Sequence, residues 1–412
     1  MAQAVVVGAG VIGLCVAYSL RARGLDVVVV DSREPGRAAS HGNAGWVTPA
    51  FSHPVPGPGI TASSLRLLLR SDSPLYIKPR LDPRFLRWLW RFWRRCNQPD
   101  YDRGVEALAR LNLRTLELYD ALVRDGVKFE MHQDGLLFLF RDLVAAEGER
   151  AHLKQMQRFG YPPARWLDFH DVHQEQAGLA ESVVGGLLAP AERHVRPESL
   201  TAGLAHTLRE RGVTIRGGVT VVDFAWSQGR IWGVRTTEEV IAASTVVLAA
   251  GAWTGRLAER AGLRIPLEGG KGYSVTFSTP ASVWNRPMYL AEARVGFTPF
   301  DGAMRLAGTM ELSGINDVML PRRIQALKDA PSAYLKGWDG ANLQEEWNGM
   351  RPLTPDGLPI IGALPGAENC ILATGHSMLG VTLGPATGEA VADLALGRPD
   401  RELLAPFRAD RF

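Results

Sequence analysis

Gly8, Gly10 and Gly13 stand near the start of the chain in the spacing G-x-G-x-x-G. An apolar run at 5–7 precedes them and an Ala- and Leu-rich run follows to Arg23, so the pattern predicts a strand, a tight turn and a helix. In such a unit the first glycine permits the turn, the second leaves room for a ligand, and the third lets helix and strand pack closely. The helix N-terminus offers unpaired N–H groups and a positive dipole end, which suit a pyrophosphate.

Asp31 is placed to complete a nucleotide site. It follows Gly8 by 23 residues and ends a second apolar run, 27–30. A carboxylate at this distance can accept hydrogen bonds from an adenosine ribose, and it disfavours a ribose 2′-phosphate. Strand, glycines, helix, strand and acid in this order predict a dinucleotide-binding unit, with NAD and FAD both open at this point. The alternative is a plain strand–helix–strand unit without a ligand.

Three later segments carry further features of a cofactor site. The loop "DSREPGRAASHGNAGWVTP" (31–49) has small residues whose main-chain N–H groups are expected to be exposed. Residues 244–253 are predicted to form a buried strand that ends in Ala-Ala-Gly. Residues 370–397 are predicted to form a strand, a glycine-rich turn and a helix that begins near Thr382, which repeats the anion-binding arrangement.

As an ordered set, these segments resemble the D-amino acid oxidase family of FAD-dependent oxidoreductases. "GNAGWVTP", "KGYS", "RPLTPDG" and "TGHSMLG" are most similar to the small subunit of bacterial D-amino acid dehydrogenase, and "GPATGEAVADL" with "FRADR" is also similar to glycine oxidase. The resemblance covers nearly the whole chain, and its motifs are specific as a set. It implies FAD as the cofactor.

The resemblance also implies an α/β fold with two domains. An FAD-binding domain of the Rossmann-like, glutathione-reductase type is expected to be discontinuous, at 1–80, 195–262 and 346–412. A second, α+β substrate domain built on an antiparallel sheet is expected at 81–194 and 263–345.

Two alternating patterns and one loop add detail. Residues 271–278 and 301–312 alternate between apolar and polar side chains, which predicts strands of the substrate domain. The Pro- and Gly-rich loop 53–59 is implied by the resemblance to lie over the active site as a lid.

The residues assigned to FAD come from the glycine unit and from positions that match the family motifs. Main-chain N–H groups at 380–382 are expected near the flavin N1–C2=O edge, where positive partial charge stabilises an anionic reduced flavin. No spacing of the nine His and three Cys predicts a metal site. The predicted FAD residues are Gly8, Gly10, Val11, Ile12, Gly13, Asp31, Ser32, Arg37, Ser40, Asn43, Ala44, Gly45, Val221, Gly251, Trp253, Arg351, Gly380, Val381 and Thr382.

Arg351 and Tyr273 are the predicted catalytic residues. A flavin that oxidises an amino acid takes a hydride from the α-carbon, so the protein has mainly to fix the substrate carboxylate. A guanidinium does this well because its forked donors match both oxygens. By motif match Arg351 takes this role, the alternative being an interdomain salt bridge. Tyr273 is expected to donate its hydroxyl to the same carboxylate, the alternative being an aromatic packed in a strand.

Three nearby residues have weaker assignments. His376 is a substrate-pocket candidate, and it is interpreted as a neighbour of the flavin or a structural histidine, because hydride transfer needs no general base. Met378 is the second pocket candidate. It stands where related glycine oxidases have an arginine, which favours the dehydrogenase branch. Lys271 is interpreted as a solvated strand end.

The resemblance implies a reaction and leaves alternatives open. The expected activity is oxidative deamination of small amino acids, D-amino acids preferred, by hydride transfer to flavin N5. The imino acid formed is hydrolysed to a 2-oxo acid and ammonia, and quinone or oxygen is the electron acceptor. One alternative is a cyclic or N-substituted substrate, such as a proline derivative, glycine or sarcosine. The other is a non-catalytic FAD-binding subunit.

The stretch "RFLRWLWRFWRR" (84–95) predicts an amphipathic helix. Asp82 and Pro83 form a helix start signal, and the aromatic residues and the five arginines fall on opposite faces. The main interpretation is packing on the core with a solvated Arg face. The alternative is peripheral contact with an anionic membrane surface.

Bulk composition excludes several classes of protein. A net charge of +3 over 412 residues, without a recognised nucleic-acid module, gives no support to nucleic-acid binding. Scattered cysteines fit a reducing compartment. Glycines interrupt the apolar N-terminus, which lacks a basic segment, so neither a signal peptide nor a spanning helix is expected. The expected location is cytoplasmic, with peripheral contact to the inner face of the cytoplasmic membrane as the extension of the helix 84–95 alternative.

Overall fold

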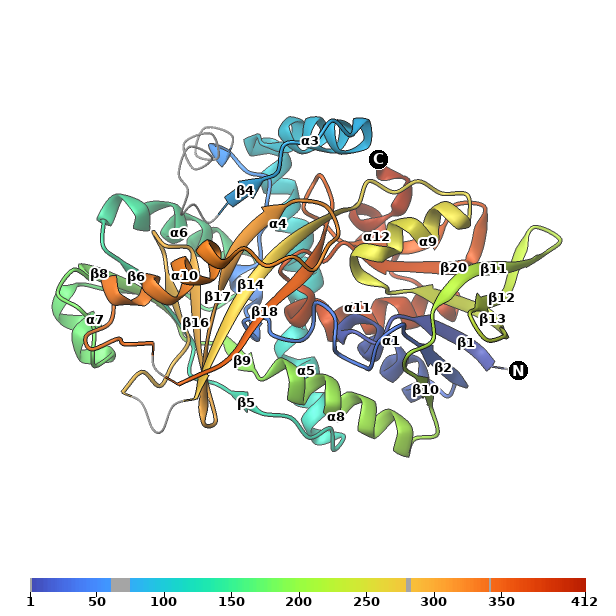
Figure 1. The fold of residues 1–412 in the computed structure, drawn as a ribbon, viewed down its shortest axis with the longest axis horizontal. Helices are drawn as coiled ribbons and strands as arrows, with labels where there is room; N and C mark the ends of the chain where they lie inside the picture. The colour runs from blue at the N-terminus through green and yellow to red at the C-terminus, as the bar shows by residue number, and fades with distance from the viewer. Residues whose placement is uncertain (1, 61–74, 279–282, 341) are drawn as a thin grey trace.

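Two β-sheets lie side by side in the molecule, each with its own helices (Figure 1). The structure is a computed structural model, and it describes residues 2–60, 75–278, 283–340 and 342–412. The two sheets correspond to the predicted α/β architecture with a mixed, largely parallel cofactor sheet and a largely antiparallel second sheet, so the predicted fold class is confirmed.

The first sheet has a parallel centre. β1 pairs in parallel with β2 and β13, and β2 and β13 pair in parallel with β10 and β20. β11, β12 and β19 extend it by antiparallel pairing. Its strands are β1 (Ala2–Val7), β2 (Val27–Val30), β10 (Thr214–Arg216), β11 (Val221–Ser227), β12 (Arg230–Thr236), β13 (Val240–Leu248), β19 (Ile360–Leu364) and β20 (Ala367–Thr374).

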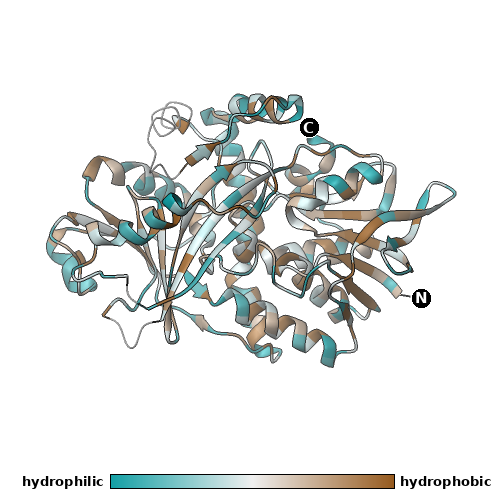
Figure 2. Cartoon of the chain, viewed as in Figure 1, coloured by the Kyte–Doolittle hydropathy of each residue, from teal (hydrophilic) through white to brown (hydrophobic). Residues whose placement is uncertain are grey.

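A layer of helices packs on this sheet, with α1 against α11 at its centre. The two helices approach closely because a Cβ on Gly388 would overlap the main chain of Cys15. The apolar composition of this half is visible in Figure 2. The helices of this layer and its surroundings are α1 (Val11–Ala22), α4 (Gln98–Asn112), α5 (Thr115–Arg124), α8 (Pro197–Glu210), α9 (Thr254–Arg260), α11 (Gly380–Ala395) and α12 (Arg401–Leu404).

The second sheet runs in the order β18-β14-β17-β16-β15-β6-β8-β7, and β4 joins it beside β17. The pairs β15–β6 and β17–β4 are parallel, and the other neighbours are antiparallel. Its strands are β4 (Leu75–Ile77), β6 (Leu136–Phe140), β7 (Arg165–Leu167), β8 (Gly185–Ala189), β14 (Glu268–Ser278), β15 (Met288–Leu290), β16 (Val295–Phe300), β17 (Ala303–Leu312) and β18 (Leu343–Leu353). The helices on this half are α3 (Pro83–Arg95), α6 (Leu143–Met156), α7 (Phe169–Glu175) and α10 (Pro321–Asp329).

A small sheet connects the two halves. Its strands are β3 (Trp46–Val47), β9 (Arg193–Val195) and β5 (Met131–His132). β4 and β18 both belong to the second sheet, whereas the expected domain bounds assign residues 75–77 and 346–353 to the cofactor domain. Neither pairing is local in sequence, so the chain alone does not predict it.

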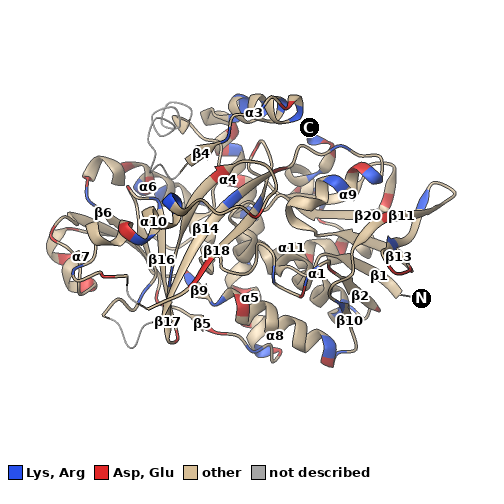
Figure 3. Cartoon of the chain, in the orientation of Figure 1, with Lys and Arg blue, Asp and Glu red and all other residues tan. Residues whose placement is uncertain are grey.

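Helix α3 has the amphipathic character that the sequence predicts, with Asp82 accepting a hydrogen bond from the Arg84 N–H as its N-cap. Phe85 and Trp88 are buried against Leu312 and Leu353. Figure 3 marks in blue the basic positions along this outer helix. Within the described ranges, every helix is too short or too polar to cross a bilayer.

We expect Gly13→Ala to destabilise the protein, because a Cβ at this position would overlap the carbonyl oxygen of Gly8 and force α1 away from β1. Overpacking of this kind costs about 1–3 kcal/mol. The measurement is denaturant-induced unfolding. The matched control is Gly148→Ala in α6, where a Cβ meets no atom within 4 Å and which should be neutral or slightly stabilising. Equal stability of the two variants would contradict the close contact at Gly13.

Candidate active site

A cavity of about 1400 Å³ lies between the two sheets. This is larger than the 300–1,000 Å³ that is common for small-ligand sites, so it has room for a dinucleotide together with a substrate. Nearly all of the predicted site residues line it, among them Gly8 and Arg351. Two do not. Gly13 is packed beneath Gly8, and Arg37 is exposed outside the cavity.

The turn after β1 has the geometry expected of a phosphate-binding loop. Gly8 has a φ of 112°, and a Cβ there would overlap the carbonyl oxygen of Ala249. Gly10 is the N-cap of α1, so the first helical N–H groups face the cavity. The N–H of Val11 donates to the Ser40 hydroxyl at 2.9 Å, which brings the predicted loop onto the helix N-terminus.

Asp31 organises the same turn. Its carboxylate accepts the N–H of Ala9 at 2.6 Å and the N–H of Arg33 at 2.8 Å. Burial raises the pKa of Asp31, and these two N–H groups oppose that effect. A carboxylate has about four lone-pair sites, so acceptor capacity remains for a hydroxyl group of a ribose.

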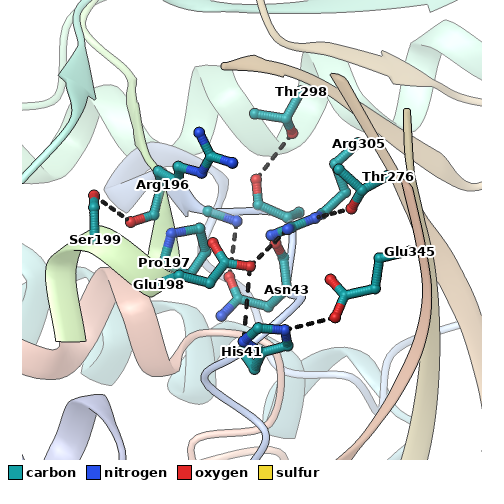
Figure 4. Close-up of polar contacts among 12 residues, drawn as sticks. His41, Asn43, Arg196, Pro197, Glu198, Ser199, Thr276, Thr298, Arg305 and Glu345 are labelled. Carbon is teal, nitrogen blue, oxygen red and sulfur yellow. Dashed lines mark hydrogen bonds and ion pairs between the residues drawn. The ribbon is translucent and has the colours of Figure 1, made fainter. Parts of the chain in front are cut away.

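The loop 41–46 is fastened to the second sheet by a buried arginine (Figure 4). Arg305 on β17 is 2% exposed and donates to the Asn43 carbonyl at 3.0 Å, to Thr276 Oγ1 at 2.9 Å and to Glu198 Oε1 at 2.6 Å. On the next strand, Thr298 donates to the Ala44 carbonyl at 2.9 Å. These contacts join the second sheet, the cofactor loop and the start of α8.

His41 extends this connection at the edge of the sheet. Its Nε2 lies 2.8 Å from Glu345 on β18, and its Nδ1 lies 4.0 Å from Glu198 (Figure 4). Sequence analysis assigned no role to Arg305, Glu198 or His41. The segment 301–312 also contains Asp301 and Glu311, so nothing local singles out Arg305, and its partners Asn43 and Glu198 lie more than 100 residues away.

The start of α11 borders the cavity at Gly380, Val381 and Thr382. Thr382 Oγ1 accepts the N–H of Thr48 at 3.1 Å and donates to the Trp46 carbonyl at 3.0 Å, so helix and loop are held in register. His376 lies against the same helix, with Nε2 2.9 Å from the Thr387 hydroxyl. Burial lowers the pKa of His376 to about 3, so the ring is neutral at physiological pH.

Arg351 lies flat on the second sheet. A Cβ on Gly272 would overlap its guanidinium. The guanidinium donates to the Thr309 carbonyl at 2.6 Å and points a second nitrogen toward the Gly308 carbonyl at 3.5 Å. Thr309 has a φ of 64°, beside an irregularity in the β14–β17 pairing that turns these carbonyls toward the arginine.

The charge of Arg351 is not neutralised by the protein. No carboxylate in the described part of the chain lies within ion-pair distance of it, and its hydrogen bonds go to uncharged acceptors, two main-chain carbonyls and the Met310 sulfur. Burial lowers the pKa of Arg351 to about 10, so the group is still protonated at neutral pH. A buried cation that lines a cavity without a counter-ion is suited to an anionic ligand.

The expectation for Tyr273 is not supported by this geometry. In a strand, neighbouring residues point to opposite faces, and Tyr273 faces away from the side on which Arg351 covers Gly272. Its hydroxyl donates to Glu311 Oε2 at 2.6 Å. The same face carries Lys271, which is 0% exposed and bonded to Glu311 at 3.1 Å, so the interpretation of Lys271 as a solvated strand end is wrong. Both residues belong to a buried structural cluster.

The loop 53–59 forms part of the cavity wall. His53 and Val55 line the cavity, whereas Pro54 packs on Gly104 and Gly357. The loop is therefore packed between α4 and the turn after β18. Met378 also lines the cavity and is 55% exposed, at its open side.

The residues present fit an FAD molecule. The N-termini of α1 and α11 both direct N–H groups into the same cavity. Glycines line the cavity beside each of these two helix N-termini, so a ligand can approach the main chain there. Asp31 retains acceptor sites for the ribose.

Comparison with known proteins agrees with this geometry. A family model described as FAD dependent oxidoreductase (DAO) matches residues 3–394. The D-amino acid dehydrogenase of Bradyrhizobium diazoefficiens is 30% identical over 426 aligned residues, which cover 100% of this chain and 99% of that protein. The D-amino acid dehydrogenase of Methylobacterium sp. (strain 4-46) is 33% identical, with 96% of each chain covered.

A solved structure shows the same fold. Glycine oxidase from Geobacillus kaustophilus superposes with a TM-score of 0.80 at 23% identity, covering 100% of this chain and 99% of that one. The family model spans most of the chain, and the relatives match it from end to end. The chain belongs to the DAO family of FAD-dependent oxidoreductases.

Proposed function

We propose that the protein oxidatively deaminates free amino acids, with D-amino acids preferred, and that it acts as a dehydrogenase. The observation that carries this proposal is the buried, unneutralised guanidinium of Arg351 in the cofactor cavity. Full-length relatives named D-amino acid dehydrogenase support the substrate class. FAD, when bound, supplies the acceptor for the hydride that leaves the substrate α-carbon.

In this proposal Arg351 anchors the substrate. The contacts with Thr309 and Gly308 hold one side of the guanidinium, and the remaining N–H groups bind the substrate carboxylate. Burial of the site strengthens this ion pair, because the surrounding dielectric is lower than that of water. Neutral His376 holds α11 in place and takes no proton. The amine nitrogen supports the imine as hydride leaves, and water then hydrolyses the imino acid to a 2-oxo acid and ammonia.

Two alternatives differ in what they require of the site. A cyclic or N-substituted amino acid would use the same anchor, with more room around the nitrogen. A non-catalytic FAD-binding subunit does not require an unpaired cation in the cavity. The presence of Arg351 there therefore disfavours this second alternative.

Anaerobic mixing with a panel of D-, L- and N-alkyl amino acids tests the proposal. We expect D-amino acids to bleach the flavin absorption band faster than their L-enantiomers and than sarcosine or proline derivatives. Faster bleaching by an N-alkyl or cyclic amino acid would transfer the assignment to that class. If no amino acid reduces the flavin, the catalytic proposal is wrong.

The variant Arg351→Ala is expected to retain FAD and to lose about a hundredfold in kcat/KM. Removing one partner of a buried charge-assisted pair costs on the order of 3 kcal/mol. Arg351→Lys should recover part of the loss, since a point charge lacks the fork of donors. Steady-state kinetics and the flavin spectrum are the measurements, with exposed Arg264→Ala as control. Normal turnover by Arg351→Ala would place the carboxylate site elsewhere.

We also propose that the electron acceptor is a quinone and that α3 contacts an anionic membrane surface. One side of α3 lines the cavity at Trp88, Leu89, Phe92 and Trp93. Its outer side exposes Leu86 by 50% and Trp90 by 52%, among basic side chains, and Trp93 at the cavity rim is 58% exposed. Apolar and aromatic groups beside arginines are suited to an interface with anionic lipid.

Three arginines of α3 are available for this contact. Arg84 and Arg95 pair with Glu259 and Asp100, whereas no ion pair is recorded within the described ranges for the other three. These are Arg87, Arg91 and Arg94.

We expect faster turnover with a quinone or dye than with oxygen, and salt-sensitive binding to anionic vesicles. Arg87→Gln, Arg91→Gln and Arg94→Gln together should weaken vesicle binding and leave turnover with a soluble dye unchanged, because the arginine charges act within a Debye length of the surface. A matched triple control replaces three exposed arginines outside α3 by Gln, Arg230 and Arg235 on β12 and Arg264 after α9. Absence of vesicle binding at low salt, or unfolding of the α3 variant, would contradict the membrane contact.

A further inference from the structure

Large side chains lie flat on glycines across the cavity face of the second sheet. Arg351 covers Gly272 on β14, and Trp46 covers Gly296 on β16. Between them β17 presents Ala307, which is opposite Gly296 in the pairing and therefore shares its face. The substrate space beside Arg351 thus opens along the sheet toward β16 and β15.

An aromatic wall continues the cavity in that direction. Tyr289 on β15 lies opposite Gly296, with its ring 6.0 Å from the ring of Trp46. Phe51 follows at 5.7 Å from Tyr289, and His53 at 5.3 Å from Phe51. All four rings line the cavity, so this arm has apolar sides from the cofactor loop outward.

A carboxylate stands at the far end of this arm. Glu149 on α6 lines the cavity and interacts electrostatically with His53, Tyr289 and Arg294. Burial raises the pKa of Glu149, while the His53 and Arg294 charges oppose the effect. No hydrogen bond or ion pair to Glu149 is recorded among the residues that the structure describes.

The neighbouring carboxylate Glu292 provides a contrast. Its Oε1 accepts the N–H groups of Arg141 and Asp142, and its Oε2 accepts the Tyr334 hydroxyl at 2.6 Å. The oxygens of Glu292 are therefore used by the fold, whereas those of the half-buried Glu149 have no donor. A half-buried carboxylate without donors gains from a cationic ligand.

The separation between the two ends fits a long side chain. Arg351 is bonded to main-chain carbonyls of β17, and Tyr289 lies two strands away on β15. Neighbouring strands are about 4.8 Å apart, so Tyr289, which interacts electrostatically with Glu149, stands roughly 10 Å across the sheet from the carbonyls that hold Arg351. A substrate carboxylate on Arg351 therefore leaves a gap that alanine or valine would not fill and that an extended basic side chain would.

We propose that Glu149 binds the cationic end of the substrate side chain and selects D-amino acids with a long basic side chain, of the arginine and lysine type. The aromatic rings of the arm provide faces for the cation and for its aliphatic stem. Arg294 faces the same arm but is exposed, so solvent screens its repulsion more than it screens the attraction of the half-buried Glu149. This proposal rests on the proposed function, because the carboxylate on Arg351 fixes the other end of the substrate.

The test compares two substrates that differ in charge and share a shape, D-arginine and D-citrulline. The wild-type holoenzyme should prefer D-arginine. Glu149→Gln, which keeps the side-chain shape, should lower kcat/KM for D-arginine by about 10- to 100-fold, mainly through KM. D-Citrulline and D-alanine should change less than about twofold. Exposed Glu147→Gln on the same helix is the matched control and should change none of the three.

The outcomes separate this proposal from the proposed function. Equal loss for D-arginine, D-citrulline and D-alanine in Glu149→Gln would mean a structural role and overturn the specificity proposal. So would a wild-type enzyme that treats D-arginine and D-citrulline alike while still oxidising D-amino acids. Failure of every amino acid to reduce the flavin, or normal kinetics of Arg351→Ala, would instead overturn the proposed function.

Discussion

The contact on which the site depends is the buried ion pair between Arg305 and Glu198. Arg305 belongs to the second sheet and Glu198 to a helix of the first, and the same guanidinium holds the Asn43 carbonyl of the cofactor loop. Breaking such a pair leaves a buried charge without compensation, which is strongly unfavourable. The two halves and the loop are therefore fixed together, and the cavity between them has a defined shape before any ligand enters.

Arg305 and Arg351 lie on the same face of the same sheet, but the charge of one is neutralised by the protein and the charge of the other is not. Arg305 is neutralised by Glu198 and surrounded by polar partners (Figure 4). Arg351 has main-chain carbonyls on one side and the cavity on the other. Carbonyl dipoles orient a guanidinium without cancelling its charge. One arginine consequently holds the architecture, and the other remains able to attract an anion.

The sequence predicted what is local. The unit formed by β1, α1 and β2 was recognisable because glycine spacing, apolar runs and Asp31 lie within thirty-one residues. Helix α3 and its Asp82 cap were recognisable for the same reason. For Tyr273 the motif gives the strand but not the direction of the side chain, which is set by pairing with β17 and β18. Arg305 and Glu149 had no local signal, since their environments are assembled from distant segments.

The glycines of the second sheet link the fold to the chemistry. A glycine within a strand weakens it, because it has no side chain to pack. At Gly272 and Gly296 that space is refilled by Arg351 and Trp46, whose side chains lie along the sheet. Side chains held flat in this way lose their conformational entropy when the protein folds. Ligand binding therefore does not have to order them at a further entropic cost. The strand positions that would be weakest by propensity thus become the ones that hold the charged and aromatic walls of the cavity in place.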